Sequence, residues 1–250
     1  MRRLAIALLA VMALVGLASP SWGADKTPKA LVYDGRGAAE GAAEDLASIL
    51  AEVGYEIKYF FDPGLLPSLL PGADLLAIGG TDDDILPLRA RFTPEVVEAM
   101  RQFVDQGGAY LGICGGAYLA AEHWAEGGET FEGFGLAPVR ARILVDRSAP
   151  RILCVAWLGR VRGMYYQAGP CFDPPAAAGE GGDVLAYYGL GDQGERAAVQ
   201  YARGKGTVLL IGPHPEATVY WLDEDGLSTD SGDCPWVPTR DLLRQAVEGL

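Results

Sequence analysis

Short apolar runs alternate with longer amphipathic segments through the first half of the chain. The apolar runs predict buried strands at 30–34, 55–61, 73–80 and 109–113. Between these runs, apolar side chains recur at helical spacing over 40–53 and in a segment that begins at Thr93. Strands that alternate with helices predict an α/β fold with a mainly parallel sheet and helices on both of its faces.

The second half of the chain carries more β-type pattern and predicts an antiparallel extension of one edge of that sheet. Apolar and β-branched runs occupy 140–145, 151–166, 184–189 and 197–212. The glycines at 203–206 predict a hairpin turn within the last of these runs. Helical spacing predicts one helix over 116–125 and a final helix over 239–250. No internal repeat or long linker is visible, so residues 24–250 are predicted to form a single domain.

The first 23 residues have the pattern of a secretory signal peptide. Arg2 and Arg3 precede an apolar run over 4–17, and small residues at 21 and 23 suit cleavage before Ala24. The apolar run is shorter than the ~20 residues of a spanning helix, which disfavours the alternative of an uncleaved anchor. We therefore expect export to the periplasm or the extracellular space, with no membrane span after cleavage.

Charge narrows the range of partners. The formal net charge of −13 becomes −15 once the two positive charges of Arg2 and Arg3 are removed. A strongly acidic surface repels phosphate backbones and anionic lipids, so neither nucleic acid nor a membrane surface is an expected partner. The expected ligand is a small-molecule or peptide-like substrate, and an envelope complex is a second class of partner.

The chain has four cysteines and two histidines, with no CxxC pair. This set does not fit a structural zinc site, so no metal is expected, and no cofactor motif is visible. If one cysteine stays free, at most one disulfide can form in an exported chain. Cys171 and Cys234 lie in proline-containing, loop-like segments and are the expected pair. Cys154 lies in an apolar run and is expected to pack as a small hydrophobic residue.

The sequence GICGG at 112–116 places Cys114 where a predicted strand turns directly into a predicted helix. The G-x-C-x-G frame is the cysteine counterpart of the nucleophile elbow, whose glycines leave room for a strained turn. Such a turn exposes the nucleophile at the carboxyl ends of the strands, where open α/β sheets bind ligands. The helix N-terminus favours a thiolate, and the Gly115 N–H would face a developing oxyanion. Taken alone, the motif fits a small buried cysteine at a tight turn better.

Two other segments change that balance. His214 follows a predicted strand in the sequence GPHPE, and Glu216 lies two residues further on. A carboxylate at this spacing can orient the imidazole, whose other nitrogen would then serve a nucleophile as general base. The alternative is a surface-loop histidine. The second histidine, His123, falls in the predicted helix after Cys114 and is interpreted as a solvated or capping residue.

A glycine pair ends another predicted strand, in the sequence AIGGTDDD. Gly79 and Gly80 leave backbone N–H groups bare near the neighbouring strand, so the Gly80 N–H is a candidate second oxyanion donor. The acidic run at 82–84 is interpreted as a solvated turn, because charge runs usually are. The alternative is an acidic rim that selects an amine-bearing substrate.

With these segments in place, the chain resembles the class I glutamine amidotransferase-like superfamily. Within it, the chain is most similar to the domain found at the N-terminus of some biotin-protein ligases and as a stand-alone exported protein. The segments that carry the resemblance span 31–38, 77–84, 107–120, 164–172 and 204–216. The resemblance implies a flavodoxin-like α/β fold with Cys114 as nucleophile, His214 as base, Glu216 as orienting carboxylate, and oxyanion donors at Gly80 and Gly115.

The sequence also departs from this family. Ile78 stands where glutamine amidotransferases usually have a proline, and neither an ammonia-accepting domain nor a biotin ligase catalytic domain is visible. Biotin ligation by this chain alone is therefore not expected. The favoured hypothesis is an exported cysteine hydrolase that cleaves an amide or related acyl bond. The alternatives are a non-catalytic binding module of the same fold and, less favoured, a redox- or stress-sensing thiol protein.

Overall fold

The computed structural model describes residues 26–82, 84–145, 149–174, 182–230 and 233–250. The predicted signal peptide, residues 1–23, lies outside these ranges. Within them, no helix is both long and apolar enough to cross a membrane.

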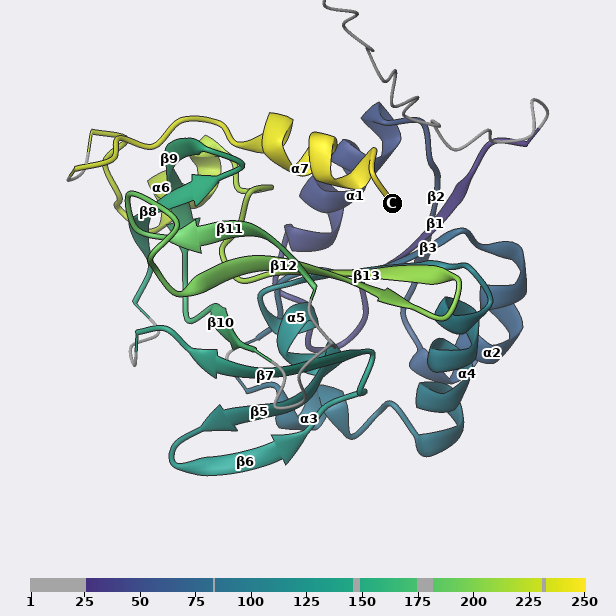
Figure 1. The fold of residues 1–250 in the computed structure, drawn as a ribbon. Helices are drawn as coiled ribbons and strands as arrows, with labels where there is room; N and C mark the ends of the chain where they lie inside the picture. Colours follow the sequence, from purple (N-terminus) through teal and green to yellow (C-terminus); the bar gives the residue numbers. More distant parts are fainter. Residues whose placement is uncertain (1–25, 83, 146–148, 175–181, 231–232) are drawn as a thin grey trace, which may run out of the picture.

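A nine-stranded sheet forms the centre of the molecule, in the order β2-β1-β3-β4-β13-β12-β11-β8-β9 (Figure 1). Its first five strands are parallel neighbours. These strands are β1 (Lys29–Tyr33), β2 (Glu56–Phe60), β3 (Leu75–Ile78), β4 (Ala109–Ile113) and β13 (Gly206–Ile211). Counted among themselves, they have the 2-1-3-4-5 order of flavodoxin-like sheets, which confirms the predicted fold class.

The remaining strands of this sheet form an antiparallel extension, as predicted, but the run expected at 140–145 lies in a second sheet and the end of the run at 197–212 is parallel to β4. The strands of the extension are β12 (Arg196–Arg203), β11 (Asp183–Tyr188), β8 (Arg151–Trp157) and β9 (Arg160–Tyr166). The predicted hairpin between β12 and β13 is confirmed, with Arg203 paired to Gly206. The extension starts beside β13, at the strand that leads into the His214 segment.

Helices cover both faces of the parallel part of the sheet, and Figure 1 shows α1 and α7 on one side with α2, α4 and α5 on the other. The longer helices are α1 (Ala42–Glu52), α4 (Pro94–Asp105) and α7 (Arg240–Val247), the last shorter than predicted. Short helical turns are η1 (Pro63–Leu65), α2 (Leu66–Leu69), η2 (Leu70–Gly72), α3 (Leu86–Arg89), α5 (Gly115–Ala120) and α6 (Val219–Glu224). Two large clusters of buried side chains fill the two faces.

The predicted helix over 116–125 is wrong in its second half. Helix α5 ends at Ala120, and the chain continues as β5 (Ala121–Glu126) in a second sheet of order β10-β7-β5-β6. The other strands of this sheet are β6 (Glu129–Glu132), β7 (Ala137–Ile143) and β10 (Pro170–Asp173). Pairing with β6 and β7 and burial of Trp124 outweigh the helical propensity of the segment. His123 therefore lies on a strand, partly exposed, with Nε2 3.8 Å from an oxygen of Glu122.

The expected disulfide between Cys171 and Cys234 is also wrong. Cys234 bonds Cys154, and the two Cα atoms are 5.4 Å apart. Cys171 is free and fully buried on β10, where its thiol donates to the carbonyl of Arg142. Cys154 is thus a bridging residue rather than a small hydrophobic one, and the bridge ties the loop before α7 to the antiparallel extension.

Candidate active site

Cys114 lies at a strained turn between β4 and α5. Its φ of 50° and ψ of −107° fall outside the helical and extended regions. The flanking glycines explain how the turn fits. A Cβ on Gly112 would lie 2.6 Å from the carbonyl oxygen of Gly116, and a Cβ on Gly116 would overlap the carbonyl oxygen of Ile78. The tight G-x-C-x-G turn predicted from the sequence is therefore present, with no space for side chains on either side.

The Cys114 side chain is buried but not sealed. It is 9% exposed and lines a cavity, while its backbone N–H donates to the Ile211 carbonyl at 2.8 Å. The sulfur lies 3.6 Å from the carbonyl oxygen of Gln167. Cys114 is also the N-cap of α5, so the N–H groups that open the helix point toward this end of the turn.

The sheet brings His214 to the same place. Strand β13 runs parallel to β4 with Ile211 paired to Ile113, so the segments that follow the two strands leave the same edge. The His214 backbone N–H donates to the carbonyl of Tyr165 at 2.9 Å, which fixes the segment against β9. The imidazole is 4% exposed and faces the same cavity as Cys114.

Glu216 holds the imidazole from the other side. Its Oε1 is hydrogen-bonded to Nδ1 of His214 at 2.9 Å, and the carboxyl group is fully buried. This contact occupies Nδ1 and leaves Nε2 as the ring nitrogen available to Cys114, which lines the same cavity. The structure thus brings together the three residues that the sequence analysis singled out.

The pKa of His214 is raised to about 10. Burial alone would lower it, because an imidazolium loses solvation in the interior. The negative charges of Cys114 and Glu216, together with hydrogen bonds to both side chains, outweigh the burial effect. The arrangement therefore favours the imidazolium form of His214.

Two aromatic side chains fix the plane of the imidazole, and the sequence analysis identified neither of them. The Tyr165 ring meets His214 edge-on, with centroids 5.6 Å apart, and the Trp221 ring lies 5.1 Å away at 56°. The indole N–H of Trp221 donates to Asp45 on α1 at 2.8 Å, which anchors α6 over the site. The only sequence signal for these contacts is the presence of aromatic residues in the second half of the chain, which does not reveal what they touch.

The glycine pair after β3 lies against the turn that holds Cys114 and against the imidazole of His214. The Gly79 carbonyl accepts from the Gly116 N–H at 3.1 Å, which joins the two turns. A Cβ on Gly80 would lie 3.0 Å from Cε1 of His214, and a Cβ on Gly115 would overlap the Thr81 side chain. Glycine is therefore required for close approach at both positions that were predicted to supply oxyanion N–H groups.

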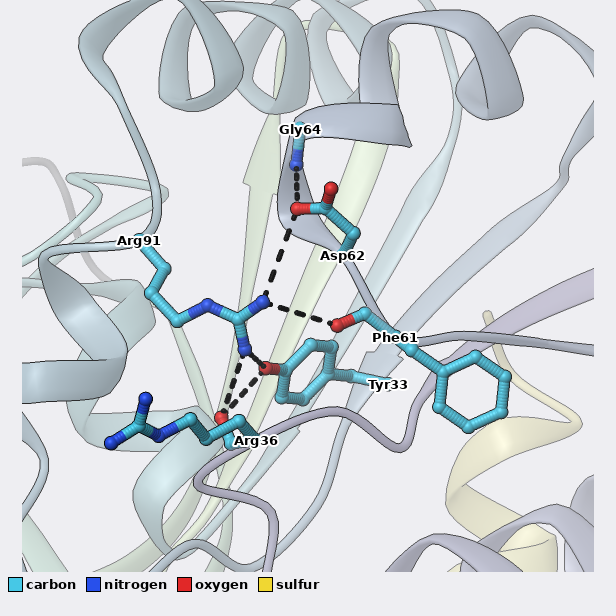
Figure 2. A network of polar contacts seen from close by, with 6 residues as sticks. All are labelled: Tyr33, Arg36, Phe61, Asp62, Gly64 and Arg91. Atoms are coloured by element: carbon cyan, nitrogen blue, oxygen red, sulfur yellow. Dashed lines mark hydrogen bonds and ion pairs between the residues drawn. The ribbon is translucent and has the colours of Figure 1, made fainter.

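The loop after β1 contributes residues 39 and 40 to the cavity lining, and Arg91 contacts the start of this loop (Figure 2). One guanidinium nitrogen donates to the Tyr33 hydroxyl at 2.9 Å and to the Arg36 carbonyl at 3.2 Å. The other donates to the Phe61 carbonyl at 3.4 Å and lies 4.0 Å from a carboxylate oxygen of Asp62. These contacts hold the start of the loop that carries residues 39 and 40 to the cavity.

The cavity has a volume of about 390 Å³, which suits a small molecule or the end of a longer chain. Loops after β1, β3, β9 and β13 line it, together with the β4–α5 turn. Residues of α5, α6, β5 and β7 complete the walls. The described residues contain no group of three or more His, Cys, Asp or Glu side chains arranged to hold a metal ion.

Comparisons with known proteins agree with this architecture. Residues 29–139 match the family model described as biotin-protein ligase, N terminal. The match includes Gly80 and Cys114 and ends before His214. A glutamine amidotransferase crystal structure gives a TM-score of 0.55 at 22% identity, covering 78% of this chain and 100% of that one. PurLQS from Thermotoga maritima gives 0.55 at 17% identity, covering 80% and 94%. The chain therefore has a class I glutamine amidotransferase-like fold, and its residues 29–139 are similar to the N-terminal family of biotin-protein ligases.

Two curated relatives are cobyric acid synthases. The protein from Desulforudis audaxviator is 31% identical over 86 residues, and the one from Streptomyces avermitilis is 35% identical over 89 residues. Each aligned segment is 34% of this chain but only 17% or 18% of the relative. The chain thus spans less than a fifth of the length of these relatives.

Proposed function

We propose that this class I glutamine amidotransferase-like domain is an exported cysteine hydrolase that cleaves an amide or a related acyl bond. The observation that supports the proposal is that Cys114 and His214 line one cavity, while Glu216 is hydrogen-bonded to Nδ1 of His214. A thiol at a strained turn, a buried imidazole beside it and a carboxylate on the far ring nitrogen are the parts that thiol acyl transfer requires.

In the proposed acylation step, the Cys114 sulfur attacks the carbonyl carbon of the substrate. The thiolate–imidazolium pair supplies the nucleophile, so the thiol proton is already held on Nε2 of His214. The N–H groups of Gly115 and Gly80 are the donors proposed for the oxyanion. When the tetrahedral intermediate collapses, the C–N bond breaks, the amine leaves with the proton from His214, and a thioester remains on Cys114.

Water completes the proposed cycle. His214 removes a proton from a water molecule that attacks the thioester carbonyl, the C–S bond breaks, and the carboxylic acid product leaves. Glu216 keeps the ring in one orientation and stabilises the imidazolium each time it forms. The likeness to a glutamine amidotransferase structure supports an amide as the bond that is cleaved.

We also propose that the protein works outside the cytoplasm. The signal-peptide pattern of residues 1–23 is the main support. The Cys154–Cys234 disulfide agrees with it, because structural disulfides persist in oxidising compartments.

Site-specific thiol alkylation tests the proposal, with Cys171 as the internal control. We expect iodoacetamide to label Cys114 in the folded protein at pH 6–7 and to leave Cys171 unlabelled, as read by peptide mass mapping. Burial raises the pKa of Cys171 to about 12, so its thiol stays protonated. His214→Asn should abolish the labelling at low pH. Labelling of Cys114 only with the slow, high-pH profile of an ordinary thiol would contradict the proposal.

Turnover needs its own measurement. Purified protein is incubated with a panel of small primary amides and short peptides, and release of ammonia or amine is followed with Cys114→Ala as the blank. Binding of panel members that survives Cys114→Ala, with no product from the wild type, would favour the binding-module alternative.

A further inference from the structure

The cavity that holds Cys114 and His214 has a charged mouth of a single sign. Three carboxylates line it, those of Glu40, Asp82 and Glu126, and all three residues are exposed. Cys114 and His214 are buried, so they form the closed end of the cavity. The acidic groups therefore lie between bulk solvent and the reacting atoms, where an incoming substrate passes them.

The convergence of these carboxylates results from the fold rather than from one acidic run. Glu40 belongs to the loop after β1, Asp82 to the loop after β3 and Glu126 to the end of β5 in the second sheet. The first two loops are fastened together, because the Asp82 N–H donates to the Gly37 carbonyl at 3.0 Å and the Ala39 N–H donates to Gly80 at 3.0 Å. Glu126 then faces the cavity from a different sheet.

Among the described residues, no lysine or arginine pairs with the carboxylates of this mouth. No lysine or arginine is among the described residues that line the cavity. Among the described residues, the three carboxylates also make no side-chain hydrogen bond or ion pair, whereas several acidic residues elsewhere pair with arginine or lysine. The charge is therefore available to a ligand. A carboxylate or phosphate on the substrate would meet only repulsion there.

Two aromatic residues also line the cavity. Trp221 lines the same cavity and is held by its hydrogen bond to Asp45, and Tyr118 lines it from α5 with its hydroxyl donating to the Ala168 carbonyl at 3.0 Å. Ammonium and guanidinium groups are attracted to the faces of such rings. Carboxylates and aromatic rings together form the usual environment for an amine-bearing ligand.

We infer that the substrates of this site are acyl donors whose acyl part carries an ammonium or guanidinium group, and that anionic acyl donors are excluded. The inference rests on the proposed function, because it assigns a substrate class to the Cys114 site. The acyl carbonyl would lie at the closed end beside Cys114, and the cation would lie at the mouth beside Glu40, Asp82 and Glu126.

Three alkylating agents of similar size and different charge test the inference on the whole protein. They are 2-bromoethylamine, iodoacetamide and iodoacetate, each used at pH 7 with Cys114 labelling followed by mass spectrometry. Each rate constant is divided by that for free N-acetylcysteine, which removes intrinsic reactivity. We expect the normalised ratio of the cationic to the anionic agent to fall at least about tenfold in Glu40→Gln/Asp82→Asn/Glu126→Gln, since local fields change encounter rates by 10–10³.

A matched control separates the mouth from the net charge of the protein. Asp183→Asn/Asp192→Asn/Glu248→Gln removes the same charge from exposed acidic residues that do not line the cavity, and its ratio should stay within about twofold of wild type. Thermal melting checks the fold of both triple variants, and the single mouth variants measure each carboxylate if the triple one unfolds.

The outcomes distinguish this inference from the proposed function. A ratio that falls only in the mouth variant supports the inference. A ratio that is unchanged in the mouth variant, or that falls equally in the control, overturns it, while rapid labelling of Cys114 by iodoacetamide leaves the proposed function intact. No labelling of Cys114 by any agent overturns both.

Discussion

Two free thiols lie in the same buried cluster, but their backbone settings differ. Cys114 lies at a positive-φ turn after a strand, with a histidine beside it and a cavity in front of it. Cys171 lies within β10, fully buried, and its thiol donates to the Arg142 carbonyl. Burial raises the pKa of Cys171 to about 12, whereas Cys114 lines a cavity together with His214. Under the proposed function, position at a strand end therefore distinguishes the nucleophilic thiol from the inert one more clearly than burial does.

Removing each thiol in turn is the strongest way to break this comparison. Cys114→Ala should lower amide hydrolysis by about 10³-fold or more, since loss of a nucleophile removes the covalent route. Cys171→Ala should leave the rate within about twofold, apart from a stability cost of about 1–2 kcal/mol for the small cavity. Rates and urea unfolding of both variants provide the measurement. Equal losses of activity in the two variants would show that the thiols do not differ as proposed.

The turn itself can be broken without touching either sulfur. A side chain on Gly116 would overlap the Ile78 carbonyl, whereas Gly191 has open space around its Cα and an ordinary φ. We expect Gly116→Ala to lower the free energy of unfolding by about 3 kcal/mol or more, as expected for overpacking against rigid backbone. Gly191→Ala should change it by less than about 0.5 kcal/mol. Urea denaturation of both variants, with Cys114 labelling as a second readout, makes the comparison.

A mild effect of Gly116→Ala, close to that of Gly191→Ala, would mean that the turn is not locked by the contact with β3. Persistent labelling of Cys114 in a destabilised variant would separate the stability role of the glycine from its role in presenting the thiol.

The disulfide offers a third contrast with Cys114, because its two cysteines stabilise the fold and carry no free thiol. The bridge joins residues 80 positions apart in sequence, so breaking it should cost about 2–4 kcal/mol in the free energy of unfolding. Cys154→Ala/Cys234→Ala should show this loss while Cys114 labelling in the folded state continues. Wild type with a reducing agent should match the double variant in urea unfolding. Equal stability of the oxidised and reduced wild type would contradict the assigned pairing.

These contrasts also show what the sequence reveals about the fold and the site. The parallel strands and the turn at Cys114 are predictable because strand pattern, glycine frame and helix start coincide within a few residues. His214 and Glu216 are predictable because they follow directly on a predicted strand, although that strand was expected in the antiparallel extension and instead pairs parallel with β4. In each case the signal is local, or follows from the order of strands in a known type of sheet.

Other features depend on contacts that no local pattern contains. The segment after Ala120 has helical propensity, and only its pairing with β7 and β6 makes it a strand. The spacing of four cysteines in the sequence does not give the distances between their sulfur atoms. The apolar run around Cys154 therefore predicts a core residue, although it forms a disulfide. Trp221 and Asp45 are 176 residues apart in sequence, and their hydrogen bond is invisible until the fold places α6 over α1.

The charge state of His214 gives a pH-dependent test of the Cys114 setting. The pKa of this imidazole is raised, so its favourable contacts are fully present below the unfolded histidine value of about 6.5 and are lost as pH rises through about 10. His214→Gln should therefore lower the melting temperature most near pH 6, and the difference from wild type should shrink toward pH 10. Melting curves across this range provide the measurement, with His123→Gln as the control because that residue is partly exposed on β5. A difference that grows with pH would mean that the imidazole is buried in its neutral form.

The smallest expected effect tests the support behind the imidazole. Trp221→Phe keeps an aromatic ring beside His214 but removes the indole N–H that donates to Asp45. We expect hydrolysis to fall about three- to tenfold, because one hydrogen bond worth about 1 kcal/mol holds α6 in place. A merely structural role would lower stability and leave the pH profile of Cys114 labelling unchanged. A positioning role should shift that profile toward the one measured for His214→Asn. Asp45→Asn keeps an acceptor for the indole N–H, so it should shift the profile in the same direction by a smaller amount.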